Sequence, residues 1–216
     1  MAELLTIVLA TSNSGKLAEL RALLADLPIQ FLSVADVLGE KLTIVEDGAT
    51  FEDNALIKAR AVCRATRTIA LADDSGLEVD ALGGRPGVRS ARFAHERATD
   101  AENNAALLRE MENIEEGQRS ARFRCVLALV SPWKEGDEHV AEGSCEGSIA
   151  RAPRGNGGFG YDPLFVVTGQ DGRAMAELSE HDKNSISHRA LAVRSLRRIL
   201  ITLVNERLDE AERIAG

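Results

Sequence analysis

The chain has 216 residues, of which 44% are hydrophobic and 28% are charged, and its net charge is −8. This length and composition are typical of a globular protein that buries its own core, and they exclude long disordered stretches. The acidic balance argues against general nucleic-acid binding, which requires a basic surface. It leaves room for a small anionic substrate, because a few lysines and arginines can be focused in one cleft.

The cysteines and the first apolar run indicate the cellular compartment in which the protein works. The chain has three cysteines, Cys63, Cys125 and Cys145, and no C-x-x-C pair, which argues against a disulfide framework or a zinc site. The apolar run 4–10 is too short to span a membrane and lacks the basic start of a signal peptide. We therefore expect a cytoplasmic protein without a membrane partner, made of one domain over residues 1–216.

The N-terminal segment predicts a strand, a turn and a helix. Residues 4–10 are apolar and β-branched, which indicates a buried strand, and residues 11–15 form a polar turn. The helix that follows is predicted by leucines at helical spacing, namely Leu17, Leu20, Leu24 and Leu27. This order is an α/β opening.

Two capping boxes predict further helices. Residues 50–53, Thr-Phe-Glu-Asp, precede a helix with an apolar face, and residues 99–102, Thr-Asp-Ala-Glu, precede another. Between them, residues 68–72 predict a short strand. We expect this strand to end at residues 73–76, Asp-Asp-Ser-Gly, because that composition is typical of a turn.

The second half of the chain adds strands and a long helix. Alternation over residues 121–129 predicts a strand with one apolar face, and residues 140–150 its antiparallel neighbour. Residues 151–162 form a glycine-rich loop, and residues 164–167 a further strand. From about Ser187 a helix is expected, with an inward stripe made of Ala192, Leu196, Ile199 and Leu203. We predict a mixed α/β protein built on a long β-sheet.

The turn after the first strand could bind an anion. Small polar residues between a strand and a helix leave backbone N–H groups available, and the helix dipole and a lysine add to the attraction. The segment consists of Thr11, Ser12, Asn13, Ser14, Gly15 and Lys16. It is no Walker A loop, because Ala10 and Leu17 stand where that motif needs glycine and Ser or Thr. The alternative is an ordinary strand–helix turn.

Acidic residues could hold a divalent cation. Asp73 and Asp74 are adjacent, and two neighbouring acids are costly to bury unless a ligand or solvent offsets their charges. Carboxylates suit Mg²⁺, which also keeps waters and contacts substrate phosphates. Glu46 could join Asp74 around the metal, and Lys58 could neutralise phosphate. The alternatives are a solvated turn and ordinary surface charges.

Two later segments could contact a base. Residues 155–163 begin as G-x-G-x-x-G, but Pro163 and an apolar strand follow, which excludes a dinucleotide-binding loop. The aromatic rings of Phe159 and Tyr161 suit base stacking instead. Residues 183–189, Lys-Asn-Ser-Ile-Ser-His-Arg, could bind phosphate and donate to a base carbonyl. The alternatives are a glycine-rich connection and a capped helix with solvated charges.

Together these segments closely resemble the Ham1-like family of non-canonical purine nucleoside triphosphate pyrophosphatases. The resemblance lies in five motifs that occur in the family's order and cover nearly the whole chain. They are T-S-N-S-G-K at 11–16, F-E-D-N-A-x-x-K-A at 51–59, A-D-D-S-G-L at 72–77, G-G-F-G-Y-D-P-L-F at 157–165 and S-x-S-H-R at 185–189.

The resemblance implies a long mixed sheet, two lobes with a central active-site cleft, a homodimer, and Mg²⁺-dependent hydrolysis of inosine, deoxyinosine and xanthosine triphosphates to monophosphate and pyrophosphate. It implies that Glu46 and Asp74 hold magnesium and that Asp74 is also the general base. Residues 11–16 would bind the triphosphate. The other implied substrate contacts are Ser75, Phe159, Gly160, Tyr161, Asp162, Lys183, His188 and Arg189.

Two other functions remain open from the sequence. One is a Maf-like pyrophosphatase for other modified bases, and the other is a nucleotide-binding module without catalysis. The adjacent acids Asp73 and Asp74 argue against the second, because a pure anion sensor gains nothing from two carboxylates beside a phosphate.

Overall fold

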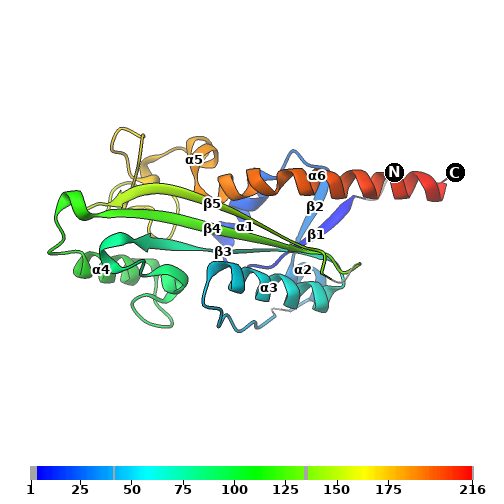
Figure 1. Cartoon of the computed structure of the whole chain (residues 1–216), viewed down its shortest axis with the longest axis horizontal. Helices are drawn as coiled ribbons and strands as arrows, with labels where there is room; N and C mark the ends of the chain where they lie inside the picture. The colour runs from blue at the N-terminus through cyan, green and yellow to red at the C-terminus, as the bar shows by residue number, and fades with distance from the viewer. Residues whose placement is uncertain (1–3, 41, 134–135, 216) are drawn as a thin grey trace. The chain divides into compact units, whose positions relative to one another are not determined.

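The structure is a computed structural model that describes residues 4–40, 42–133 and 136–215. Within the described residues, six strands form one sheet in the order β2-β1-β3-β4-β5-β6 (Figure 1). The strands are β1 Leu5–Leu9, β2 Ile29–Ser33, β3 Ile69–Val79, β4 Ser120–Val130, β5 Glu138–Ile149 and β6 Phe165–Val167. Strand β1 pairs parallel with β2 and β3, whereas β5 pairs antiparallel with β6. The predicted α/β fold with a mixed sheet is confirmed.

Helices flank the sheet. The α-helices are α1 Ser14–Leu23, α2 Val34–Leu38, α3 Phe51–Thr66, α4 Asp100–Glu110, α5 Glu180–Ile186 and α6 His188–Ala215. The 3-10 helices are η1 Asp80–Leu82, η2 Gly87–Arg92, η3 Glu116–Gln118 and η4 Met175–Glu177. No helix of the described chain is both long and apolar enough to cross a lipid bilayer.

The chain divides into two compact units. The first comprises Met1–Asp74, Val126–Glu142 and Ala192–Gly216, and the second comprises Ser75–Cys125 and Gly143–Leu191. The division falls inside β3, between two consecutive residues, Asp74 and Ser75. The expectation of one domain with a cleft between two lobes stays a prediction.

In the first unit, α3 and the part of α6 that belongs to this unit lie on opposite sides of the strands (Figure 1). Covering on both faces explains why β1 is a continuous apolar run rather than an alternating one. The buried stripe of α6 consists of Ala192, Val193, Leu196, Leu200 and Val204. The predicted stripe was partly wrong, because Ile199 and Leu203 lie at its edges and are half-buried.

Two other local predictions were wrong. Helix α1 ends at Leu23, so Leu27 lies beyond it, although Leu20 and Leu24 are fully buried as the spacing requires. Strand β3 does not end before Asp73 but continues through residues 73–76 to Val79. Turn composition is a local preference, and pairing within a sheet overrides it when the charges find partners.

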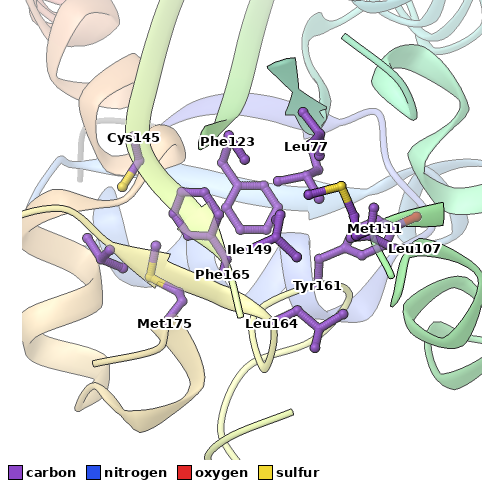
Figure 2. Packing of buried hydrophobic residues seen from close by; sticks show 13 residues of the cluster. Leu77, Leu107, Met111, Phe123, Cys145, Ile149, Tyr161, Leu164, Phe165 and Met175 are labelled. Carbon is purple, nitrogen blue, oxygen red and sulfur yellow. The ribbon is translucent and has the colours of Figure 1, made fainter. Parts of the chain in front are cut away.

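The core of the second unit draws residues from β3, α4, β4, β5, β6 and the glycine-rich loop (Figure 2). The rings of Phe123 and Phe165 pack with their centroids 4.6 Å apart. Tyr161 and Leu164, from the loop before β6, enter the same core and are 4% and 0% exposed. The end of the glycine-rich loop is therefore tied to the core rather than free in solvent.

Candidate active site

In the first unit, Lys58 joins two carboxylates. Its Nζ lies 2.7 Å from Oε2 of Glu46 and 2.6 Å from Oδ1 of Asp74. Helix α3 presents Lys58 from its second turn, after the predicted capping box between Thr50 and Asp53, which is confirmed. The lysine is 8% exposed, so the two carboxylates meet at one charge that is largely shielded from water.

The segment that carries Glu46 is held close to the same helix. The N–H of Gly48 donates to Oδ1 of Asn54 over 2.9 Å, and Asn54 is 1% exposed. A Cβ at Gly48 would lie 2.6 Å from Cβ of Asp53 and 2.7 Å from Oδ1 of Asn54. Only glycine therefore permits this approach, which brings Glu46 to Lys58.

A second lysine, Lys16, pairs with Asp73. Its Nζ lies 2.6 Å from Oδ1 of Asp73, whose side chain is fully buried. Successive side chains of a strand point to opposite faces, so Asp73 and Asp74 leave β3 in different directions and each meets its own lysine. This pairing explains how two adjacent acids lie within a strand rather than in a solvated turn.

The predicted anion loop forms the N-terminus of α1. Oδ1 of Asn13 accepts a hydrogen bond from the N–H of Lys16 at 3.0 Å, and Oγ1 of Thr11 accepts one from the N–H of Asn13 at 3.2 Å. These two N–H groups are therefore engaged inside the loop. The intrahelical ladder does not use the N–H groups of Ser14 and Gly15, and these are the ones that suit an anion.

The ionisation of this cluster follows from burial and pairing. Burial disfavours the charged form of Lys58, but the charges of Asp74 and Glu46 outweigh that effect and raise its pKa, so the ammonium persists. Burial raises the pKa of Asp74, although the neighbouring Lys58 and Lys16 oppose the shift. Asp74 is thus a more basic carboxylate than an exposed aspartate.

The donor set suits a divalent cation of the magnesium type. The oxygens of Glu46 and Asp74 approach one point, the Nζ of Lys58, within 2.7 Å. Magnesium is commonly held by one or two carboxylates together with waters and substrate phosphates. No cluster of three or more His, Cys, Asp or Glu side chains with metal-binding geometry occurs among the described residues. The two carboxylates alone fit a shared, open site rather than a closed protein cage.

In the second unit, Asp162 organises the glycine-rich loop. Its Oδ2 accepts hydrogen bonds from Nζ of Lys183 at 2.7 Å and from the N–H of Phe159 at 3.0 Å. The ammonium of Lys183 lies 5.0 Å from the centroid of the Phe159 ring, within cation–π range. A Cβ at Gly158 would lie 2.0 Å from Oδ2 of Asp162, so the chain needs glycine there.

Arg189 and His188 extend this cluster. The Cζ of Arg189 lies 5.8 Å from the centroid of Phe159, and its Nη2 donates to Oγ of Ser75 over 3.0 Å. The imidazole of His188 stacks on Phe123, with centroids 4.8 Å apart and an interplanar angle of 15°. Arg189 and His188 are 1% and 5% exposed, so packing fixes both side chains.

The structure thus gathers the predicted residues into two groups, one in each unit. The first group contains residues 11–16, Glu46, Lys58 and Asp74, and the second contains Ser75, residues 159–162 and residues 183–189. Sequence reasoning missed that Asp73 is the partner of Lys16. It also read Tyr161 as a stacking residue, whereas its hydroxyl donates to the carbonyl of Ser90 over 2.8 Å in the core.

This arrangement, an α/β sheet with buried lysines and carboxylates beside a helix N-terminus, has the features that suit a protein acting on phosphate compounds. The sequence model of the Ham1 family matches residues 7–199, and the chain belongs to this family. It is 52% identical to a dITP/XTP pyrophosphatase of Desulforamulus reducens, over 90% of this chain and 94% of that protein.

Two solved structures of Ham1 proteins agree with this family assignment. The chain is similar to a HAM1 protein from Coxiella burnetii, with a TM-score of 0.82 and 45% identity, covering 92% of this chain and 99% of that one. It is also similar to the Ham1 protein of Staphylococcus aureus, with a TM-score of 0.80 and 37% identity over 91% and 98% of the two chains.

Proposed function

We propose that this protein hydrolyses the non-canonical purine nucleoside triphosphates ITP, dITP and XTP to the monophosphate and pyrophosphate. The observation that carries the proposal is the approach of Glu46 and Asp74 to one buried cationic position, with a second lysine–aspartate pair beside it. The relative from Desulforamulus reducens, which is named a dITP/XTP pyrophosphatase, supports the choice of substrate.

In the proposed reaction, Glu46 and Asp74 would hold Mg²⁺. When bound, this ion supplies Lewis-acid polarisation of the phosphate oxygens and offsets the charge of the transition state. Lys16 and Lys58 add positive charge for the polyphosphate, and the first-turn N–H groups of Ser14 and Gly15 add donors.

Asp74 orients a water molecule and accepts its proton. The water oxygen attacks the α-phosphorus, the bond between that phosphorus and the bridging oxygen breaks, and pyrophosphate leaves with the bonding electron pair. Burial raises the pKa of Asp74, which brings this base nearer to the working pH. The step needs no covalent intermediate.

The second group would recognise the base. Phe159 stacks on the purine, and its ring is positioned by Lys183 and Arg189. Inosine and xanthosine carry a keto oxygen at the six-position, where adenine carries an amino donor. Donors from His188, Arg189 or the loop N–H groups would bond to the keto oxygen. An amino group at the six-position would leave such a buried donor unpaired.

A substrate panel tests the proposal. The purified protein is incubated with Mg²⁺ and dITP, ITP, XTP, dGTP or dATP, and both pyrophosphate and orthophosphate are measured. We expect equimolar monophosphate and pyrophosphate, with dITP, ITP and XTP preferred. Release of orthophosphate, a preference for other modified bases, or binding without turnover would each contradict the proposal, the last in favour of a non-catalytic module.

Assembly and location complete the proposal. We propose a cytoplasmic homodimer. The three cysteines are buried and none forms a disulfide in the described residues, which suits a reducing compartment. Light scattering coupled to gel filtration would measure the mass in solution, and a monomer at micromolar concentration would rule the dimer out.

A further inference from the structure

Two side chains of helix α4 bind one residue of the glycine-rich loop, Gly160. We propose that Asp100 and Asn104 are positioning residues, which set the place of the Phe159 ring for base binding by fixing Gly160. This inference rests on the proposed function for its substrate, but the contacts that carry it lie within the second unit. It assigns a role in substrate binding to two residues outside all five motifs.

The contacts engage both polar backbone atoms of Gly160. Its N–H donates to Oδ2 of Asp100 over 2.7 Å, and its carbonyl oxygen accepts from Nδ2 of Asn104 at 2.9 Å. Asp100 and Asn104 are four residues apart on one helix, so their side chains emerge from the same face. We call this pair of bonds the α4 clamp.

The start of α4 is itself fixed. Thr99 is the N-cap, and its hydroxyl and the carboxylate of Glu102 form the predicted capping box, which the structure confirms. Asp100 is therefore the first residue of a capped helix, where a carboxylate also interacts favourably with the helix dipole. A rigid helix end is a better support for a loop than a second loop would be.

The clamp acts on a residue that lies between two neighbours with other anchors. Phe159 is held at its N–H by Asp162, and Tyr161 is held in the core by Ser90. Gly160, between them, has a φ of +62° and no atom within 4 Å of the place where a Cβ would stand. Its peptide groups could rotate if the α4 clamp were lost, and the Phe159 ring would move with them.

The environment of Asn104 allows binding to be separated from stability. The side-chain amide of Asn104 donates through Nδ2 to the carbonyl of Gly160. Its oxygen, Oδ1, is a buried acceptor that has no hydrogen-bond partner among the described residues. A buried unpaired acceptor costs stability. Replacing Asn104 with leucine removes the unpaired acceptor together with the hydrogen bond to Gly160. These two effects on stability oppose each other, so we expect the variant to be about as stable as the parent protein.

The experiment compares Asp100→Ala, Asn104→Leu and Asp100→Asn with the parent protein. The matched control is Glu112→Ala, which removes an exposed carboxylate just beyond α4. Hydrogen exchange is followed by mass spectrometry on peptides that cover residues 155–162, without substrate. Steady-state hydrolysis of dITP with Mg²⁺ gives KM and kcat, and thermal unfolding gives Tm.

We expect faster exchange at residues 155–162 and a KM that is about tenfold higher for Asp100→Ala and about fivefold higher for Asn104→Leu, with kcat changed less than about twofold. Asp100→Asn should fall between the parent and Asp100→Ala, because its Oδ1 still accepts from Gly160. The control should match the parent in all three measurements, and Asn104→Leu should keep its Tm.

Unchanged exchange in the loop would overturn the proposal, as would faster exchange with an unchanged KM or a fall in Tm that accounts for the whole loss of activity. If the parent protein does not hydrolyse dITP, the proposed function fails. The exchange measurement then decides the role of the α4 clamp without any substrate, since it reads the loop directly.

Discussion

Replacing Lys58 with methionine should destabilise the protein strongly and make its stability depend on a divalent cation. The ammonium lies 2.7 Å from Glu46 and 2.6 Å from Asp74, and the side chains of Lys58 and Asp74 are 9% and 11% exposed. Methionine preserves most of the volume, so the change removes the charge and little packing. Two carboxylates are then left together with no cation between them.

The magnitude follows from that burial. Removing one partner from a buried ion pair costs about 3–5 kcal/mol, because the remaining charge stays desolvated. For comparison, Arg60 on the same helix forms a bidentate pair with Glu138, but its side chain is 46% exposed. Exposed pairs contribute about 0–1 kcal/mol, so Arg60→Met is the matched control.

Urea unfolding measures both variants with and without Mg²⁺. We expect Lys58→Met to lose about 3–5 kcal/mol without the ion. A cation held by Glu46 and Asp74 stabilises the folded state by about 2.7 kcal/mol at one hundred times its Kd, so Mg²⁺ should restore much of the loss. A loss no larger than that of Arg60→Met, or a loss that Mg²⁺ does not reduce, would refute the reasoning.

Three further predictions concern single side chains. Asp74→Asn should lower kcat at least about a hundredfold while circular dichroism stays native, since it removes the base and a metal ligand; unchanged turnover would discard that role. Lys16→Ala should raise KM about equally for every base and should expose the buried charge of Asp73; an altered base preference would contradict the phosphate assignment. The backbone N–H of Thr99 lowers the pKa of Glu102 from 4.5 to about 2, so its stabilising effect is full above pH 4.5 and is lost as pH falls toward 2; the difference in urea midpoint between the parent and Glu102→Gln should therefore narrow over that range.

Local rules succeeded wherever a few neighbouring residues decide the structure. The capping boxes at Thr50 and Thr99 use contacts between residues three apart, and both helices begin where these boxes place them. The first strand also follows from its apolar run, and leucine spacing predicts the helix after it, except that Leu27 lies beyond the end of that helix. The family motifs contain most of the residues that the structure gathers into the two groups, and the roles of these residues in binding and catalysis stay predictions.

Prediction failed where distant partners decide. Nothing within residues 73–76 shows that Lys16 and Lys58 neutralise the two acids, and without these partners a turn is the sound expectation. The α4 clamp joins Asp100 to Gly160, and the sequence offered no signal for it beyond the capping box that contains Asp100. Strand β2 was missed because it has only five residues, most of which are only partly buried.

Three lysine–aspartate pairs share one design, and their energetics bear on function. Lys16 meets Asp73 at 2.6 Å, Lys58 meets Asp74 at 2.6 Å and Lys183 meets Asp162 at 2.7 Å, and the side chains of the three aspartates are at most 11% exposed. Apolar residues of similar volume often give equal or greater stability than a buried ion pair. Replacing both partners of a pair by apolar residues therefore need not lower the stability of the fold, whereas removing one partner alone does. We propose that the pairs of Lys16 and Lys183 provide ammonium groups that are already desolvated and held in place, so that little reorganisation is required when an anionic substrate arrives.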